Sequence, residues 1–344
     1  MIPPQPQNDQ RAPLWQHELR LAFNRPADLL AYLELDPATA GLGLEALRDF
    51  PLRVPRGFAA RMRKGDPLDP LFLQVWPSLR ESDASPGYVV DAVGDLGKVR
   101  EAGLIHKYQG RVLLVATGAC AVHCRYCFRR HFPYSEQLAA RDHWAAALAE
   151  IAADGSIEEV ILSGGDPLSL SDDKLAELVS ALDEIKHLKR LRIHTRQPIV
   201  LPERIDDRPL AWLDRTRLQT VFVLHANHSA ALDESVRNAL LPLRQRGIVL
   251  LNQSVLLRGV NDDADALSAL SQRLFECGVL PYYLHLLDRV QGAAHFDLPE
   301  SEAQQLMRVL SSRLSGYLLP KLVREISGAP AKTWIAWEPS RPSE

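Results

Sequence analysis

The stretch HKYQGRVLLVATGACAVHCRYCFRRHF, residues 106–132, joins an apolar run to three closely spaced cysteines. The run Val112–Thr117 predicts a buried strand, and Cys120, Cys124 and Cys127 follow its carboxyl end. Three thiolates can hold three irons of a [4Fe–4S] cube and leave the fourth iron without a protein ligand. A structural zinc site that adds His123 or His131 is the alternative, although such sites usually contain a second cysteine pair.

Outward from this stretch, apolar runs and amphipathic segments alternate. Strands are predicted at 112–117, 159–163, 191–195, 220–225, 248–254 and 281–286. Helices are predicted at 139–153, 173–188, 233–246, 263–277 and 302–314, with a shorter, less clear one at 210–218. Six such βα units predict an α/β fold with a parallel sheet covered on both faces. A partial barrel and a flat doubly wound sheet both fit this count, and cysteines at a strand end favour the barrel.

The first hundred residues lack this alternation. Helical patterns at 15–23 and 26–33 precede a proline-punctuated stretch at 50–76. We therefore expect a mostly helical N-terminal extension over residues 1–105, a barrel over 106–320 and a C-terminal segment over 321–344.

Composition narrows the class of protein. The 344 residues carry 40 Lys and Arg against 43 Asp and Glu, a net charge of −3, which gives no electrostatic reason to expect nucleic acid or an anionic membrane as partner. The polar start resembles no signal peptide, and no apolar run is long enough to cross a bilayer. We expect a cytoplasmic protein with reduced thiols, in which Cys277 is a buried residue at the end of a helix.

The cysteine spacing, with the aromatic Tyr126 before the third thiol, resembles the radical S-adenosylmethionine superfamily. The fold of that superfamily is a partial (βα)6 barrel. The surrounding stretch is similar to the lysine 2,3-aminomutases in particular, and the similarity runs from about Phe50 to Thr333. The resemblance implies a [4Fe–4S] cluster, S-adenosylmethionine and pyridoxal phosphate as cofactors. It also implies an isomerase that converts L-α-lysine to β-lysine, using a 5′-deoxyadenosyl radical.

Several residues at strand ends would then contact S-adenosylmethionine. The Gly164-Gly165-Asp166 turn after the second strand can bend with positive φ, and its acid can take a ligand ammonium. His194 and Gln253 end two further strands, and the resemblance implies that they and Tyr126 also contact this cofactor.

The resemblance also assigns a pyridoxal phosphate and substrate site. Lys332, after a Gly/Pro turn, matches the lysine that bonds to the cofactor. The segment before the cysteines, which meets the cofactor phosphate in the family, supplies Lys107, Tyr108 and Arg111. Arg129 matches the arginine that binds the substrate carboxylate. Two acids match those that hold the distal ammonium of lysine: Asp288, and Glu325 in place of a family aspartate.

A chain that ends soon after Lys332 resembles the bacterial enzymes that make (R)-β-lysine for elongation factor P. This implies a functional link to that factor and its lysyl ligase, and a need for an electron donor. A 2,3-aminomutase for another amino acid, such as arginine, is one alternative. A non-catalytic iron–sulfur or zinc protein is the other.

Overall fold

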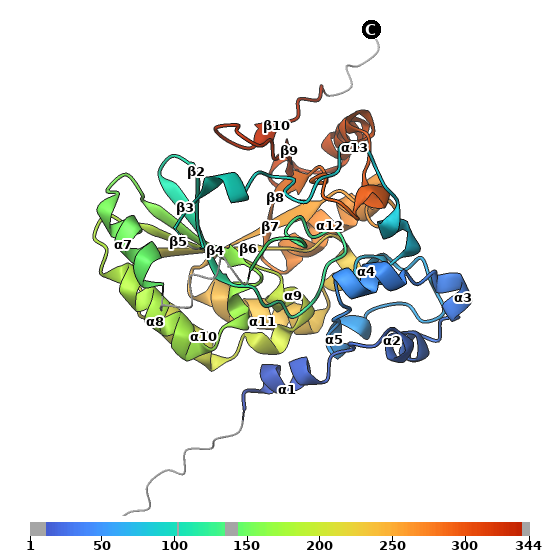
Figure 1. Cartoon of the computed structure of the whole chain (residues 1–344), viewed down its shortest axis with the longest axis horizontal. Helices are drawn as coiled ribbons and strands as arrows, with labels where there is room; N and C mark the ends of the chain where they lie inside the picture. Colours follow the sequence, from blue (N-terminus) through green and yellow to red (C-terminus); the bar gives the residue numbers. More distant parts are fainter. Residues whose placement is uncertain (1–11, 102, 135–143, 339–344) are drawn as a thin grey trace, which may run out of the picture.

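Ten strands form one sheet in the part of the chain that this computed structural model describes, residues 12–101, 103–134 and 144–338. They lie in the sheet in sequence order (Figure 1). The strands are β1 Val99–Glu101, β2 Leu104–Tyr108, β3 Arg111–Thr117, β4 Glu159–Gly164, β5 Arg190–Thr195, β6 Gln219–Leu224, β7 Val249–Val255, β8 Leu280–His285, β9 Lys321–Arg324 and β10 Thr333–Trp334.

Strand order decides between the two architectures. From β3 to β9 every neighbouring pair is parallel, and the order never reverses. A doubly wound sheet would reverse its order at a switch point, whereas a barrel adds strands in one direction. Strands β1 and β10 are not paired with each other, so the barrel stays open. The predicted partial barrel is confirmed.

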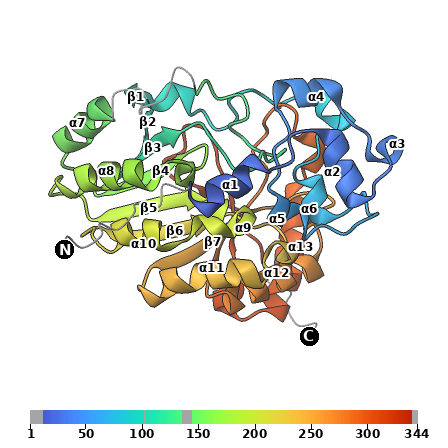
Figure 2. The ribbon, with the colours of Figure 1, turned by 90° about the horizontal axis from the view of Figure 1, so that it is seen from below.

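Helices connect the parallel strands. The longer ones are α7 Ala145–Ala153, α8 Asp172–Asp183, α10 Asp207–Leu213, α11 Glu234–Gln245, α12 Ala264–Glu276 and α13 Glu300–Arg313. Side chains of Ser171, Asp206, Asp233 and Asp263 accept backbone N–H groups where four of them begin. Helices α7, α8, α10 and α11 follow one another along one side of the sheet (Figures 1 and 2).

Most predicted elements agree with the structure. Each of the six predicted strands matches β3 to β8 within one residue at either end. The helix predicted at 210–218 is wrong in extent, because Asp206 caps it and it ends at Leu213. The helix at 173–188 is likewise too long, since α8 ends at Asp183. Residues 139–143 of another predicted helix lie outside the described part of the chain.

The four strands that sequence reasoning did not predict flank the barrel. Strands β1 and β2 form an antiparallel hairpin against β3, and β10 pairs antiparallel with β9. The N-terminal extension is thus not wholly helical. The boundary expected between residues 105 and 106 lies inside β2.

Short helices make up the rest of the N-terminal part. They are α1 Leu14–Arg20, α2 Pro26–Leu33, α3 Pro37–Ala40, α4 Leu44–Asp49, α5 Arg56–Ala59 and α6 Pro70–Leu73. Helix α5 contacts α9 (Gln197–Val200), which directly follows β5, so this part covers the carboxyl ends of the strands. Its apolar side chains join the barrel in one continuous core. Helices α2, α3 and α4 lie together on the right in both ribbon views (Figures 1 and 2).

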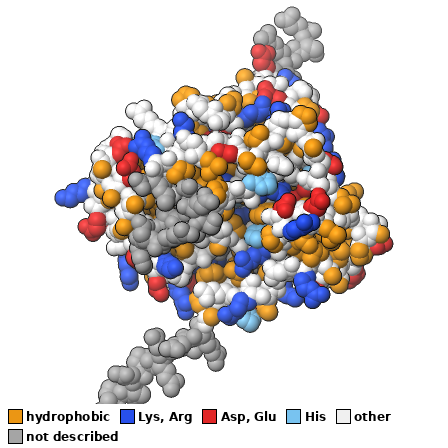
Figure 3. Space-filling model, viewed as in Figure 1, with side chains coloured by type: hydrophobic (Ala, Val, Ile, Leu, Met, Phe, Trp, Pro, Cys, Tyr) orange, Lys and Arg blue, Asp and Glu red, His pale blue; other side chains and the backbone are white. Residues whose placement is uncertain are grey.

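Acidic and basic side chains are interspersed over the face seen in Figure 3. Within the described ranges, no helix has the length and apolar character needed to span a bilayer.

Candidate active site

One cavity of about 390 Å³ gathers the predicted cofactor and substrate residues. Those that line it are Lys107, Tyr108, Arg111, Arg129, His194, Gln253, Asp288, Glu325 and Lys332. These residues are up to 225 positions apart in the sequence (332 − 107), yet they come from neighbouring strands and their carboxyl-terminal loops. This is the end of a barrel at which loops build ligand sites.

The alternation of side chains along the strands places groups in this cavity. Ile161 and Ser163 of β4 line it, as do Arg192 and His194 of β5. Residues two apart face the same side of a sheet, so each strand supplies a pair to the concave face. Tyr283 and His285 do the same on β8.

Lys332 is held beside an acid at the edge of the sheet. It immediately precedes β10, and the connection from β9 turns at Gly328, whose φ of +82° favours glycine. Its Nζ lies 2.8 Å from Oε2 of Glu325. Oε1 of Glu325 accepts a short hydrogen bond from the Tyr108 hydroxyl. Burial acts to raise the pKa of Glu325, but Lys332 and Tyr108 outweigh it and the pKa is lowered.

A second buried acid, Asp95, links two predicted cationic groups. Its Oδ1 lies 2.6 Å from Nζ of Lys107, and its Oδ2 accepts a 2.7 Å bond from Nε of Arg129. Burial acts to raise the pKa of Asp95, but the two cations lower it overall. Arg129 also donates from Nη1 to Ser163 at 3.0 Å, while within the described residues Nη2 forms no hydrogen bond. One edge of this guanidinium is therefore available to a ligand carboxylate.

Asp288 is the acid of the cavity that lacks a partner. Its Oδ1 is buried and accepts no hydrogen bond from the described part of the chain. Burial raises its pKa to about 7, against the opposing charge of Lys332. A desolvated carboxylate in this state would be stabilised by an added ammonium group.

Three histidines add neutral polar groups. Burial lowers the pKa of His194, His225 and His285, that of His225 to about 4. All three line the cavity, and their Nε2 atoms have no partner among the described residues. At neutral pH these rings are uncharged hydrogen-bonding groups. Sequence reasoning found only His194.

The cysteines lie in residues 118–134, the cysteine loop, directly after β3. Cys120, Cys124 and Cys127 are half-buried, and burial raises the pKa of Cys127 to about 11. Arg196 donates from Nη1 to Sγ of Cys124 at 2.7 Å. Among the described residues no three His, Cys, Asp or Glu side chains surround one point, as a zinc ion would require. The thiolates of a cube bind different irons, so they do not need to converge.

The glycine turn supports this loop from β4. Gly164 has φ of +113°, and the Gly165 and Asp166 N–H groups donate to Thr117 O and Ala119 O, both at 2.7 Å. A Cβ on Gly165 would lie 2.4 Å from Ala119 O. These N–H groups thus bind the end of β3 and the start of the cysteine loop.

The carboxylate of Asp166 is hydrogen-bonded to groups of the protein itself. Its carboxylate accepts hydrogen bonds from the Thr195 hydroxyl and from the N–H groups of Leu168, Arg196 and Gln197. It does not line the cavity. Its contact with a ligand ammonium stays a prediction.

Tyr126 and Arg111 take different places. Tyr126 packs edge-on against Phe296, with the Arg196 guanidinium 5.6 Å from its ring centre, and it lies outside the cavity lining. Arg111 stacks on the ring of Tyr108 at 4.7 Å inside the cavity. Cys277, as predicted, is buried at the end of α12.

These residues fit the cofactors that the cysteine motif and Lys332 suggest. Three thiols on one loop, with a guanidinium at one sulfur, suit a cluster that carries thiolate charge. A cavity with a lysine at its edge and further cations on β2 and β3 suits a phosphorylated aldehyde.

Known proteins resemble this chain in sequence over most of its length. The Radical SAM superfamily matches residues 114–269. L-lysine 2,3-aminomutase of Haemophilus influenzae is 49% identical over 94% of this chain and 95% of its own length. L-lysine 2,3-aminomutase of Escherichia coli is 49% identical over 93% of each chain. A solved radical SAM methyltransferase from Sphaerobacter thermophilus matches with a TM-score of 0.47 and 17% identity, over 66% of this chain and 71% of that one.

Proposed function

Because this chain belongs to the lysine 2,3-aminomutase family of radical S-adenosylmethionine enzymes, we propose that it moves the amino group of L-lysine from C2 to C3. One observation carries the choice of substrate. An arginine with an unused edge, a lysine and two acids line the same cavity: Arg129, Lys332, Asp288 and Glu325.

Each end of lysine then has a partner. Arg129, oriented by Asp95 and Ser163, binds the α-carboxylate through its remaining N–H groups. Asp288, whose Oδ1 has no partner in the described residues, binds the distal ammonium together with Glu325. A glutamate substrate would bring a carboxylate towards these acids, which would repel it. Arginine keeps a distal cation and remains the nearest alternative.

The cofactor residues follow the same arrangement. Cys120, Cys124 and Cys127 hold the cluster, and Lys332 bonds to pyridoxal phosphate, with Lys107 and Arg111 near its phosphate. When bound, the cluster and S-adenosylmethionine supply a carbon radical, and the pyridoxal ring delocalises an unpaired electron. Glu325 accepts a hydrogen bond from the Nζ of Lys332 at 2.8 Å and so orients the nitrogen that would bond to the cofactor. The neutral histidines present hydrogen-bonding nitrogens without adding charge.

The test is a product analysis. The protein is reconstituted anaerobically with iron and sulfide, then incubated with lysine, S-adenosylmethionine, pyridoxal phosphate and a reductant. Mass spectrometry should find β-lysine and 5′-deoxyadenosine. If arginine is rearranged and lysine is not, while S-adenosylmethionine is cleaved, the result would favour an arginine 2,3-aminomutase. Absence of 5′-deoxyadenosine under all conditions would favour a non-catalytic protein.

Variants assign the two cofactors. Cys120→Ala, Cys124→Ala and Cys127→Ala should each lose the cluster and turnover, whereas Cys277→Ala, buried and outside the cysteine loop, should keep both. Borohydride should fix the pyridoxal group on the peptide that contains Lys332. A pyridoxal group fixed on Lys107 or Lys321 instead would contradict the assignment of Lys332.

The resemblance also supports a finer proposal. The product is (R)-β-lysine for attachment to elongation factor P by its lysyl ligase, and an electron donor reduces the cluster. Chiral chromatography of the product decides its handedness.

A further inference from the structure

The cysteine loop is irregular, and the N-terminal part of the chain holds it in place. Arg125 N donates to Gln74 O at 2.9 Å, and His123 N donates to Arg53 O at 3.1 Å. These backbone bonds attach the loop to residues more than forty positions earlier. A loop that must hold three thiols in fixed places needs such attachment, because it has no helix or strand of its own.

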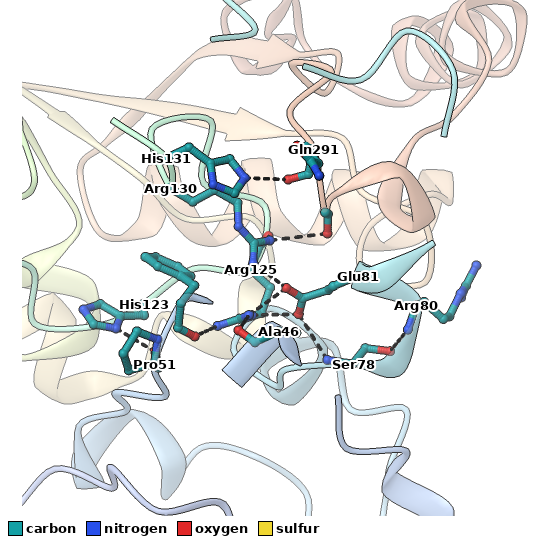
Figure 4. A network of polar contacts seen from close by, with 12 residues as sticks. Ala46, Pro51, Ser78, Arg80, Glu81, His123, Arg125, Arg130, His131 and Gln291 are labelled. Atoms are coloured by element: carbon teal, nitrogen blue, oxygen red, sulfur yellow. Dashed lines mark hydrogen bonds and ion pairs between the residues drawn. The ribbon is translucent and has the colours of Figure 1, made fainter. Parts of the chain in front are cut away.

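One acid from the N-terminal part joins two arginines of this loop (Figure 4). Glu81 lies in the short 3-10 helix η1 (Leu79–Ser82), and its side chain is 1% exposed. Its Oε1 accepts from Arg125 Nε at 2.8 Å, and its Oε2 accepts from Nη2 of both Arg125 and Arg130 at 2.6 Å. Ser78 N donates to Oε1 at 3.1 Å and fixes the carboxylate on η1.

The arginines flank the thiols in the sequence and are themselves buried. Arg125 directly follows Cys124, and Arg130 lies three residues after Cys127. The side chains of Arg125 and Arg130 are 0% and 3% exposed. Arg125 also donates to the carbonyls of Phe50 at 2.5 Å and Ala46 at 2.9 Å. Arg130 donates to Arg125 O at 3.0 Å.

Charge is not balanced within this group. Two guanidinium groups share one carboxylate, which leaves one net positive charge in a buried place. Electrostatic interactions link Arg125 to Cys124 and Arg130 to Cys127. Buried charges are screened little by salt, so the net positive charge of this group acts on a cluster bound to the neighbouring thiols. The potential of an iron–sulfur cluster depends on such neighbouring charge, and reduction adds an electron that a positive charge stabilises.

We propose that Glu81 is a positioning residue for the cluster: through Arg125 and Arg130 it fixes the cysteine loop and sets the net charge that tunes the reduction potential. This inference rests on the proposed function, because it requires the cysteine loop to hold a [4Fe–4S] cluster.

The experiment compares three variants of the full chain. Glu81→Gln keeps the shape but removes the negative charge, so the midpoint potential should rise. Arg130→Gln removes a positive charge, so the midpoint should fall. Asp83→Asn is the matched control, because Asp83 is an exposed acid two residues away, and it should leave the midpoint unchanged. Each midpoint is measured by an anaerobic redox titration that follows the electron paramagnetic resonance signal of the reduced cluster.

The outcomes separate the two proposals. Shifts of opposite sign in Glu81→Gln and Arg130→Gln support the inference. A purely structural role predicts lost iron without a shift, or shifts of the same sign, and either result overturns the tuning. If Glu81→Gln retains too little iron for a titration while Asp83→Asn retains all of it, the positioning role stands and Arg130→Gln alone decides the tuning. Wild-type protein that binds no four-iron cluster would instead refute the proposed function.

Discussion

At the scale of one residue, the proposed preference for lysine depends on Asp288. A charge-assisted contact is worth about 1.5–3 kcal/mol, so Asp288→Asn should lower kcat/KM for lysine by roughly 10- to 100-fold. An uncharged analogue of similar length never needs the carboxylate and should be affected far less. Arg129→Lys should lower kcat/KM for both substrates by a similar factor, because both present a carboxylate. If Asp288→Asn lowered kcat/KM equally for lysine and for the analogue, Asp288 would have a structural role and would not bind the distal ammonium.

The raised pKa of Asp288 predicts a pH dependence. The groups that act on this carboxyl are Lys332, Glu325, Lys107 and Asp95, and burial raises its pKa to about 7. Below pH 7 the acid is neutral and binds an ammonium weakly, so kcat/KM for lysine should rise as the pH passes through 7. The folded pKa lies above the unfolded one of about 3.9, so stability falls as the pH rises through this interval.

Asp288→Asn should therefore lose the rise in kcat/KM near pH 7. It should also have a higher Tm than the wild type at pH 8 and a similar Tm near pH 4. Enzyme assays and thermal unfolding across this range check both statements. A pH profile for lysine that is unchanged in the variant would assign the titration to another group.

Replacing Asp95 should impair the binding of both the cofactor and the substrate. Its carboxylate contacts Lys107 and Arg129, which we assign to different ligands. Asp95→Asn keeps the size but loses the charge, so affinity for pyridoxal phosphate and KM for lysine should both worsen, each by roughly tenfold at about 1.4 kcal/mol. Absorbance titration with the cofactor and steady-state kinetics measure the two effects. If neither the cofactor affinity nor KM changed, Lys107 and Arg129 would be oriented without the charge of Asp95.

The two positioning acids show what sequence reasoning misses at this scale. Cys120 and Lys332 stand in recognisable motifs, but Asp95 and Glu81 are single acids in irregular segments. Their partners are 34 and 44 residues away for Arg129 and Arg125. Ser78 and Glu81 form a capping box at the start of η1, and this local pattern indicates only a helix start. It says nothing of an arginine.

At the scale of elements, short apolar runs predicted the parallel strands, whether burial is continuous, as in β4, or alternates, as in β5 and β7. Strands β1 and β10 have three and two residues, too few for any period to appear. Strand β10 matters because Lys332 directly precedes it. The sequence located that lysine through its motif but not through an expected strand.

The close approach of β4 to the cysteine loop can be tested at one glycine. Gly165→Ala places a Cβ against Ala119 O, whose backbone cannot yield without moving Cys120. Iron content after reconstitution should fall, and S-adenosylmethionine cleavage should fall with it. Gly155→Ala, four residues before β4, adds a Cβ with no heavy atom within 4 Å and should leave both unchanged. Full iron content in Gly165→Ala would mean that the loop has room to shift.

At the scale of the whole molecule, we expected three parts, and that division stays a prediction. The apolar core argues that the first two parts act together. Buried side chains of the N-terminal part, such as Leu29, Phe58 and Phe72, belong to one cluster with Leu162 of β4 and Phe222 of β6. Each Å2 of apolar surface buried in this common core stabilises the folded protein by about 25 cal/mol, so the two parts stabilise each other. Glu81 adds a polar link between them.

A common core predicts common unfolding. In denaturant, amide hydrogen exchange followed by mass spectrometry should show peptides from α2 and from β4 losing protection at the same concentration, because neither can expose its side of the core alone. The connection between β9 and β10 should open earlier, since Ile326 and Trp334 are largely exposed and none of the connecting residues is buried. It serves as an internal control that separate opening is detectable. Earlier loss of protection in α2 than in β4 would show that residues before the barrel form an independent unit. In that case the cysteine loop would keep its attachment only while that unit stays folded, and cluster loss should follow the unfolding of α2 rather than that of the barrel.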